Sequence, residues 1–164
     1  VGIFRIAKRL VEPINYAITI LNPYVQNQLS REDNDINFKD LIKNFLIPLI
    51  FVLTISYLSF GKNFIEFLSG KEFIEAYYPM LILLIGYCTY LATFWIRQLL
   101  LFNDLLQHHV VSKVISTVSF LVFSYFFVNQ YGASGLAIAL SISMILQKVY
   151  EFYIFNKFTK QTNK

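Results

Sequence analysis

The sequence is short of charged residues, of cysteine and of the residue groupings that build enzyme or metal sites. Charged residues make up 15% of the 164 residues and hydrophobic residues make up 56%, whereas a soluble domain carries about 25% charged residues. A single cysteine, Cys88, excludes an internal disulfide and a cysteine-rich metal site. No Gly-rich phosphate loop, Ser/His/Asp set or pair of carboxylates is visible. Composition therefore favours an integral membrane protein that is not an enzyme and carries no cofactor.

Long apolar stretches predict helices that cross a membrane. A bilayer core about 30 Å thick needs roughly 20 mostly apolar residues in a helix. The stretches here are too long and too continuously apolar for barrel strands. We therefore expect an all-α polytopic bundle that forms one membrane domain over residues 1–164. The expected helices are residues 41–60, 79–102, 110–128 and 133–155, with a fifth and more polar one at residues 1–28.

The distribution of basic residues predicts the direction of these helices. Bases gather at alternate ends of the expected spans, and residues 129–134 hold none. The positive-inside rule then places the loops at 29–40 and 103–109 and the C-terminal tail in the cytoplasm. His108 and His109 fall in one of these loops and are expected to have no ligand role. The bases of the cytoplasmic side are Arg31, Lys39, Lys43, Arg97, Lys113, Lys148, Lys157, Lys160 and Lys164; those of the outer side are Lys62 and Lys71.

Proline and small residues refine this scheme. Pro13, Pro23 and Pro48 lie inside expected helices and predict kinks, whereas Pro79 suits the first turn of a helix. In the last expected helix, small residues recur at four-residue spacing and predict close packing between helices. Two such rows are Gly135, Ala139 and Ser143, and Ala133, Ala137 and Ser141. The chain has no initiator methionine and starts in a helical pattern, so we interpret it as the C-terminal part of a larger protein.

The first expected helix carries a polar stripe along an otherwise apolar segment. Projected at about 100° per residue, its charged side chains fall on one face and its aliphatic ones on the other. Three interpretations remain open: the helix lies flat at the membrane interface, it spans with its bases reaching the headgroups, or it lines a water-filled cavity. We favour the cavity, since a wall with three bases and one acid would attract an anion. The substrate-path candidates are Arg5, Lys8, Arg9, Glu12 and Tyr16.

Two further bases lie near the cytoplasmic ends of expected helices. Arg97 lies near the end of the segment at 79–102, and Lys113 lies one turn into the segment at 110–128. Long basic side chains at these positions commonly anchor a helix at the headgroups. The alternative is that Arg97 and Lys113 belong to a gate at the cytoplasmic side.

Four segments resemble a known family in the family's own order. "VGIFRIAKRL" resembles the helix start of bacterial polysaccharide exporters and oligosaccharide flippases, and "LNPYVQNQLSR" resembles the polar helix exit that follows it. "FLSGKEFIEAYYPMLILLIG" is similar to the family's outer loop, and "NQYGASGLAIALSIS" to the start of a late helix. These proteins belong to the multidrug/oligosaccharidyl-lipid/polysaccharide exporter superfamily. The chain departs from the family at Phe4, where tyrosine is commoner.

The resemblance implies a fold and a function. It implies a MATE-like transporter of two helical bundles, of which this chain supplies about five helices of the second. It also implies a multi-pass protein of the bacterial cytoplasmic membrane that moves undecaprenyl-diphosphate-linked oligosaccharide, of the O-antigen, capsule or exopolysaccharide type, by alternating access. A proton or sodium gradient would drive transport. Membrane lipid, a glycan polymerase and chain-length proteins would be its partners, and nucleic acid would not.

Other functions stay open at this point. The same fold would serve a peptidoglycan-precursor flippase or a multidrug exporter, although an exporter of cations should present acids, and only Glu12 lies in the stripe. A membrane-embedded glycan polymerase or glycosyltransferase would need catalytic groups on a sizeable loop. A membrane scaffold that transports nothing is a further alternative.

Overall fold

The protein is a bundle of helices. The computed structural model describes residues 2–29, 44 and 46–162, and every element in this part of the chain is helical. The expected all-α class is therefore confirmed. The loop at 29–40 with its bases lies almost entirely outside the described residues. The elements are α1 (Gly2–Val11), α2 (Pro13–Leu29), α4 (Ile47–Ser69), the 3₁₀ helix η2 (Lys71–Ala76), α5 (Tyr77–Ala92), α6 (Phe94–Phe102) and α7 (Leu106–Thr162).

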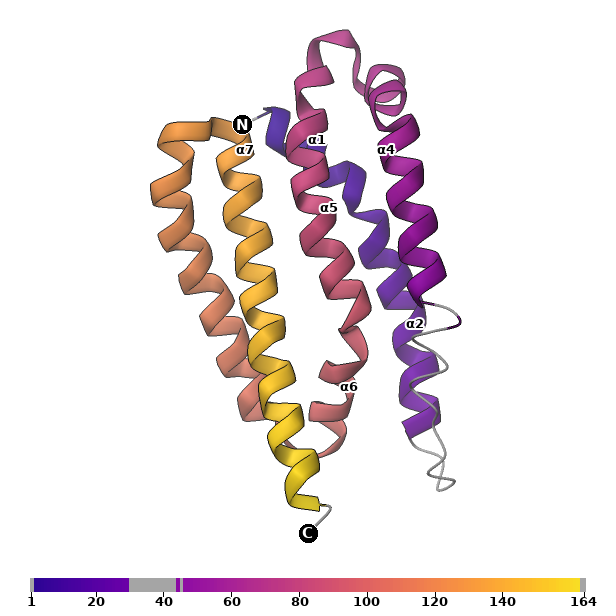
Figure 1. Ribbon diagram of the computed structural model, residues 1–164, viewed down its shortest axis with the longest axis vertical. Helices are drawn as coiled ribbons and strands as arrows, with labels where there is room; N and C mark the ends of the chain where they lie inside the picture. Colours follow the sequence, from indigo (N-terminus) through magenta and orange to yellow (C-terminus); the bar gives the residue numbers. More distant parts are fainter. Residues whose placement is uncertain (1, 30–43, 45, 163–164) are drawn as a thin grey trace.

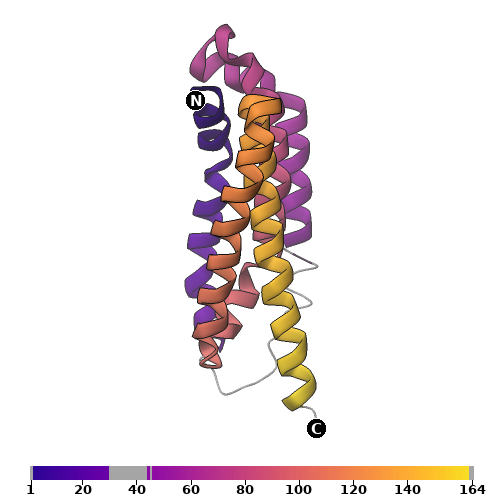
Figure 2. The same ribbon diagram turned by 90° about the vertical axis from the view of Figure 1, so that its left-hand side faces the viewer.

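The helices run up and down the long axis of the bundle. One end holds the start of α1, η2 and the reversal of α7, and the other holds residues 103–105 and the C-terminal end of α7 (Figures 1 and 2). Helix α5 is central, because α1, α4 and α7 all pack against it. The regions expected in the cytoplasm and those expected outside thus lie at opposite ends, as far as the structure describes them.

Helix α7 is a hairpin of two arms. Its 57 residues include one residue with non-helical angles, Gly132, at φ 54° and ψ −122°. These are the angles of the first central residue of a type II′ turn, which glycine adopts without strain. A straight helix of this length would measure about 85 Å at about 1.5 Å per residue, far more than a membrane core. The segments expected at 110–128 and 133–155 fall in the two arms, although the first arm already begins at Leu106.

The stretch at 1–28 is two helices and not the continuous helix expected from its polar stripe. The chain turns at Glu12, because Pro13 disfavours helical angles in the residue before it. Near this break the hydroxyl of Tyr57 on α4 donates to the carbonyl of Leu10. Pro23 lies inside α2, while Pro48 lies in the first turn of α4 and not in a helix interior. The prediction of a kink at Pro13 is confirmed, whereas the prediction that Pro48 kinks a helix interior is wrong.

A second break divides the stretch expected as one helix at 79–102. Thr93 has φ −119° and ψ 10° between α5 and α6. Its hydroxyl donates to the carbonyl of Thr89 at 2.7 Å, a bond that bends helices. The carbonyl of Ala92 accepts a hydrogen bond of 3.1 Å from the indole of Trp95. A local side-chain donor therefore replaces a bond that the backbone loses.

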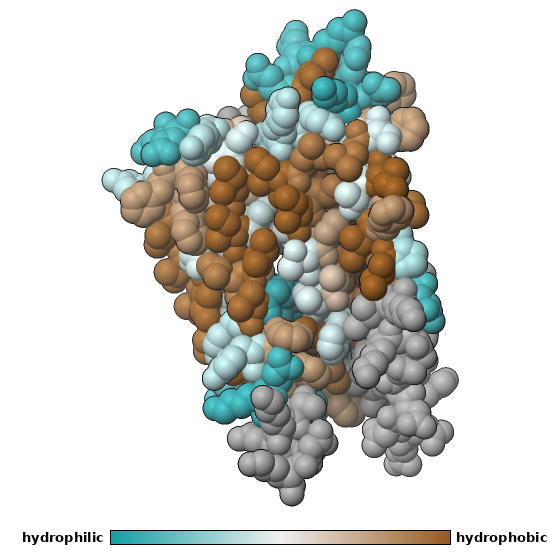
Figure 3. Space-filling model, in the orientation of Figure 1, coloured by the Kyte–Doolittle hydropathy of each residue, from teal (hydrophilic) through white to brown (hydrophobic). Residues whose placement is uncertain are grey.

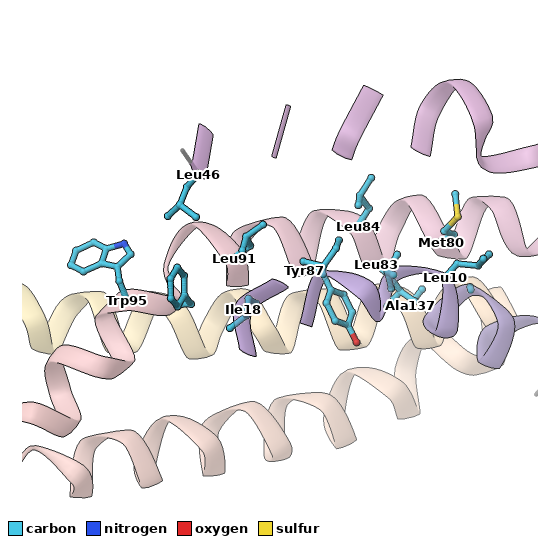
Figure 4. Close-up of a cluster of buried hydrophobic side chains, with 14 of the residues drawn as sticks. Leu10, Ile18, Leu46, Met80, Leu83, Leu84, Tyr87, Leu91, Trp95 and Ala137 are labelled. Atoms are coloured by element: carbon cyan, nitrogen blue, oxygen red, sulfur yellow. The ribbon is translucent and has the colours of Figure 1, made fainter. Parts of the chain in front are cut away.

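Apolar side chains from α1, α2, α4, α5, α6 and α7 form one core around α5 (Figure 4). The second arm of α7 packs closely against α5 at Gly86, where a Cβ atom would lie 3.0 Å from Cα of Ser141. The hydroxyl of Ser141 also donates to the carbonyl of Ile82 at 2.8 Å. The small residues of this arm do permit close packing, as expected. The labelled core residues of Figure 4 are Leu10, Ile18, Leu46, Met80, Leu83, Leu84, Tyr87, Leu91, Trp95 and Ala137.

Among the described residues, three helical stretches are long and apolar enough to cross a membrane, by length and composition: Ile47–Ser69, Lys71–Phe102 and Leu106–Phe158. In α4 and α7 little of the apolar surface is buried in the bundle, and Phe51, Phe67 and Tyr125 are among the exposed large side chains. Figure 3 shows a hydrophobic middle zone with hydrophilic residues toward the ends. The chain is thus compatible with a membrane protein. Neither α1, with 10 residues, nor α2, with 17, is among these three.

Candidate functional site

The polar stripe of α1 and α2 lies on the outside of the described bundle. Arg5, Lys8 and Arg9 are exposed, Glu12 is half-buried, and Tyr16 is 67% exposed. The opposite face of the same helices is buried against the core. This burial follows from the two-faced sequence pattern, because aliphatic side chains leave water while charged ones stay accessible. The buried side chains are Ala7, Leu10, Val11, Ile14, Ile18 and Val25.

Within the described residues, the charged side chains of the stripe form no ion pair with one another. In the described part of the chain, no carboxylate lies within 4.0 Å of Lys8 or Arg9, and Glu12 is joined to neither. The three cations Arg5, Lys8 and Arg9 therefore share about one helical turn with no ion-pair partner among the described residues. If these bases line a cavity, its facing wall lies outside the described residues.

Farther along α2, the polar face turns inward at an amide cluster. Gln98 on α6 is 5% exposed. Its amide nitrogen donates to Asn22 at 2.9 Å, and its amide oxygen accepts from Gln26 at 3.2 Å. These bonds satisfy a buried amide, which would be costly to leave unpaired. They also join α2 to α6 next to Arg97.

A buried carboxylate that the sequence interpretation did not single out joins the two arms of α7. Glu151 is fully buried. Its Oε1 atom accepts from Ser112 at 2.8 Å and from the amide of Gln147 at 3.0 Å, and lies 3.1 Å from Nδ1 of His109. Its Oε2 atom accepts from Nζ of Lys148 at 2.7 Å. We call these five residues, His109, Ser112, Gln147, Lys148 and Glu151, the Glu151 junction.

Two more cations lie around the Glu151 junction. Arg97, on α6, lies close enough to Lys113 and Lys148 for its positive charge to repel theirs. Nζ of Lys148 lies 4.2 Å from the ring centroid of Tyr90 on α5, and Nζ of Lys113 lies 5.8 Å from it. Lys113 also reaches the amide oxygen of Gln147 at 3.5 Å. The structure therefore brings together Arg97 and Lys113, the two residues considered for a cytoplasmic gate.

The junction contains a serine, a histidine and a carboxylate, the residue types of a hydrolase triad, but their hydrogen bonds do not follow the order of a triad. The hydroxyl of Ser112 lies 2.7 Å from the carbonyl of His109 and 2.8 Å from Glu151. In a triad, the serine hydroxyl is hydrogen-bonded to one ring nitrogen of the histidine, and the carboxylate is hydrogen-bonded to the other ring nitrogen. Here serine and imidazole both bind the carboxylate, so the arrangement holds helices together. Within the described residues, no three His, Cys, Asp or Glu side chains gather as a metal site.

The assignment of the two histidines to a loop is wrong. Both lie in α7, which begins at Leu106. His109 is 8% exposed and binds Glu151, and Nδ1 of His108 lies 3.2 Å from the hydroxyl of Tyr150. The sequence does contain a signal for this cluster: Gln147, Lys148 and Glu151 interrupt an apolar run at a spacing that puts them on one helix face.

Comparison of the chain with protein-family models, with curated proteins and with solved structures finds no match. The resemblance to polysaccharide exporters therefore rests on the four sequence segments.

Proposed function

We propose that this chain is part of a membrane transporter that moves lipid-linked oligosaccharide or polysaccharide precursors across the bacterial inner membrane by alternating access. One observation carries the proposal: Arg5, Lys8 and Arg9 are exposed on one face of α1 and have no carboxylate partner in the part of the chain that the structure describes, while the opposite face packs into the bundle. An anionic substrate is the counter-charge that such a face recruits.

The chemistry of the three side chains suits a diphosphate. Arginine offers planar donors that match phosphate oxygens in pairs, and lysine adds a compact charge. Charges at membrane depth are costly and are typical of substrate paths. In this mechanism the diphosphate rests on the basic face, and the lipid tail stays in the bilayer. Tyr16, exposed one turn beyond Glu12, offers a ring and a hydroxyl to the attached sugar.

The arrangement of the bundle supports a multi-pass protein with its C-terminus in the cytoplasm. Three helices have the length and composition of membrane spans. The end of the bundle that holds residues 103–105 and the end of α7 is the end that the positive-inside rule assigns to the cytoplasm. Substrate would then reach the basic face from that side and leave near the N-terminal end of α1.

The test is glycan export by the intact protein carrying Lys8→Ala and Arg9→Ala together. We expect surface glycan to fall at least about tenfold at equal protein level, since each lost charge-assisted contact to phosphate is worth about 1.5–3 kcal/mol. The matched control is Lys157→Ala, which removes an exposed base near the end of α7. Unchanged surface glycan in the double variant would remove the basic face from the mechanism.

A further inference from the structure

The end of the bundle around the Glu151 junction has more positive charge than it can neutralise. Three basic side chains, Lys148, Lys113 and Arg97, lie around one carboxylate, that of Glu151. Lys148 forms an ion pair with this carboxylate, since its Nζ lies 2.7 Å from Oε2 of Glu151 and both side chains are almost fully buried. Two cations therefore remain without a counter-charge among the described residues.

The carboxylate of Glu151 is already engaged by side chains other than Arg97 and Lys113. Its two oxygens already accept from four side chains, at distances between 2.7 and 3.1 Å. A carboxylate has about four lone-pair sites. Neither Arg97 nor Lys113 is among its ion-pair partners.

Arg97 shows that this end of the bundle is not simply a solvated charged surface. Its Nε atom is buried and has no hydrogen-bond partner in the described part of the chain. A buried donor without a partner costs about 1–3 kcal/mol, and more when it is charged. Lys113 is exposed, and its contacts are a long hydrogen bond of 3.5 Å to Gln147 and the ring of Tyr90 at 5.8 Å. The Nε donor of Arg97 is therefore held without a partner among the described residues, and the exposed ammonium of Lys113 is free to close on a ligand.

We propose that Arg97 and Lys113 form a binding site for a phosphate-bearing anion at this end of the bundle, with the Lys148–Glu151 pair as its positioning element. The guanidinium supplies paired donors and the ammonium a mobile charge, a combination that suits phosphate. Lys113 lies about 10 Å along α7 from Leu106 at about 1.5 Å per residue, so the site is near one membrane boundary. Its ligand is a phospholipid headgroup or a soluble phosphate or diphosphate. The site is separate from the basic face of α1 and does not depend on the proposed transport.

The fluorescence of Trp95 can report on this site. Trp95 is the single tryptophan of the sequence, lies two residues from Arg97, and is 9% exposed. Its ring meets Phe155 of the second α7 arm edge-on at 5.4 Å. The intact protein, with any tryptophan outside this sequence replaced by phenylalanine, is placed in nanodiscs of neutral phosphatidylcholine and titrated with inorganic pyrophosphate. A second arm replaces part of the lipid by phosphatidylglycerol without pyrophosphate.

We expect Trp95 emission to change in at least one arm. A response to pyrophosphate identifies a soluble phosphate as ligand, and a difference between the two lipid compositions identifies a headgroup. Arg97→Gln and Lys113→Gln should each raise the half-saturating concentration about tenfold or more, or abolish the lipid difference. The affinity of Arg97→Lys should lie between those of the wild type and Arg97→Gln, because lysine keeps the charge and loses the paired donors.

The controls separate this site from bulk charge and from the basic face. Lys157→Gln and the pair Arg5→Gln and Lys8→Gln should leave the response unchanged within about twofold. Lys113 is exposed, so Lys113→Gln should keep wild-type helicity by circular dichroism. The proposal is overturned if neither arm changes Trp95 emission, if both glutamine variants respond as wild type, or if Lys157→Gln weakens the response equally. Loss of glycan export in basic-face variants with an intact Trp95 response would separate the two proposals.

Discussion

Removing the buried carboxylate of Glu151 should be among the most destabilising single changes in the chain. Lys148 is 2% exposed, and without Glu151 its ammonium would stay buried without a counter-charge. Removing one partner of a buried ion pair costs about 3–5 kcal/mol. Four hydrogen bonds at about 1 kcal/mol each give a similar sum. We therefore expect Glu151→Ala to lower the free energy of unfolding by about 4 kcal/mol.

A double-mutant cycle isolates the charge interaction from the other bonds. Glu151→Gln keeps an acceptor for Ser112 and His109 but turns its amide nitrogen toward the ammonium, and Lys148→Met keeps the length of the side chain. Because each single change leaves one buried charge without its counter-charge and the double change leaves no buried charge, we expect a coupling energy of about 2 kcal/mol or more. Neutral hydrogen bonds between membrane helices average only about 0.6 kcal/mol in such cycles.

The measurement is reversible unfolding of the purified intact protein in mixed micelles, with SDS as denaturant and helicity as readout. The matched control is the pair Lys71 and Glu66, which lie 3.4 Å apart with side chains 82% and 43% exposed. An exposed pair couples by less than about 1 kcal/mol. A coupling of about 0.6 kcal/mol or less for Lys148 and Glu151 would refute the ion-pair reasoning.

Three further changes test the packing. Gly86→Ala should lower the unfolding free energy by about 1–3 kcal/mol, because its Cβ would lie 3.0 Å from Cα of Ser141. Gly135→Ala should cost about 3 kcal/mol or more, since its Cβ would clash with the carbonyl oxygen of Phe127 in the other arm of α7. Gln98→Leu should cost about 1–2 kcal/mol by removing both amide bonds to α2, and cross-linking between α2 and α6 should fall with it. All three are read by the same SDS titration.

Two substitutions serve as controls for these. Gly2→Ala places a Cβ at 3.8 Å from Phe73, which is ordinary contact, and should change stability little. Gln107→Leu removes an exposed amide at the start of α7 and should leave the link between α2 and α6 intact. Equal losses in the controls and in the test variants would contradict the packing argument.

The helical elements could be predicted because their signals are local. Apolar runs of membrane length mark α4, α5 and the two arms of α7, and Pro13 marks the break between α1 and α2. The outward position of Arg5, Lys8 and Arg9 follows from helix periodicity alone. In each of these cases, the residues that decide the outcome lie within a few turns of one another.

The Glu151 junction could not be predicted in the same way, because its partners are distant in sequence. His109 and Glu151 are 42 residues apart and meet because α7 reverses at Gly132. The break at Thr93 was also missed, since a threonine bends a helix only when its hydroxyl takes a backbone carbonyl. From the local sequence, a polar residue inside an apolar run can be interpreted as a membrane-interface anchor or as part of a binding site. Which partners it meets depends on the tertiary packing.

The one-residue reversal at Gly132 has a practical consequence for topology mapping. A glycosylation sequon, an epitope tag or a fused reporter needs a flexible loop, and this end of α7 offers a single glycine between two helical arms. An insertion here would push apart Gly135 and Phe127, whose backbones are already in close contact. Reporters are therefore better placed at residues 103–105 or beyond the end of α7, and the hairpin tip is better probed by labelling a single cysteine introduced at Asn129, which is exposed.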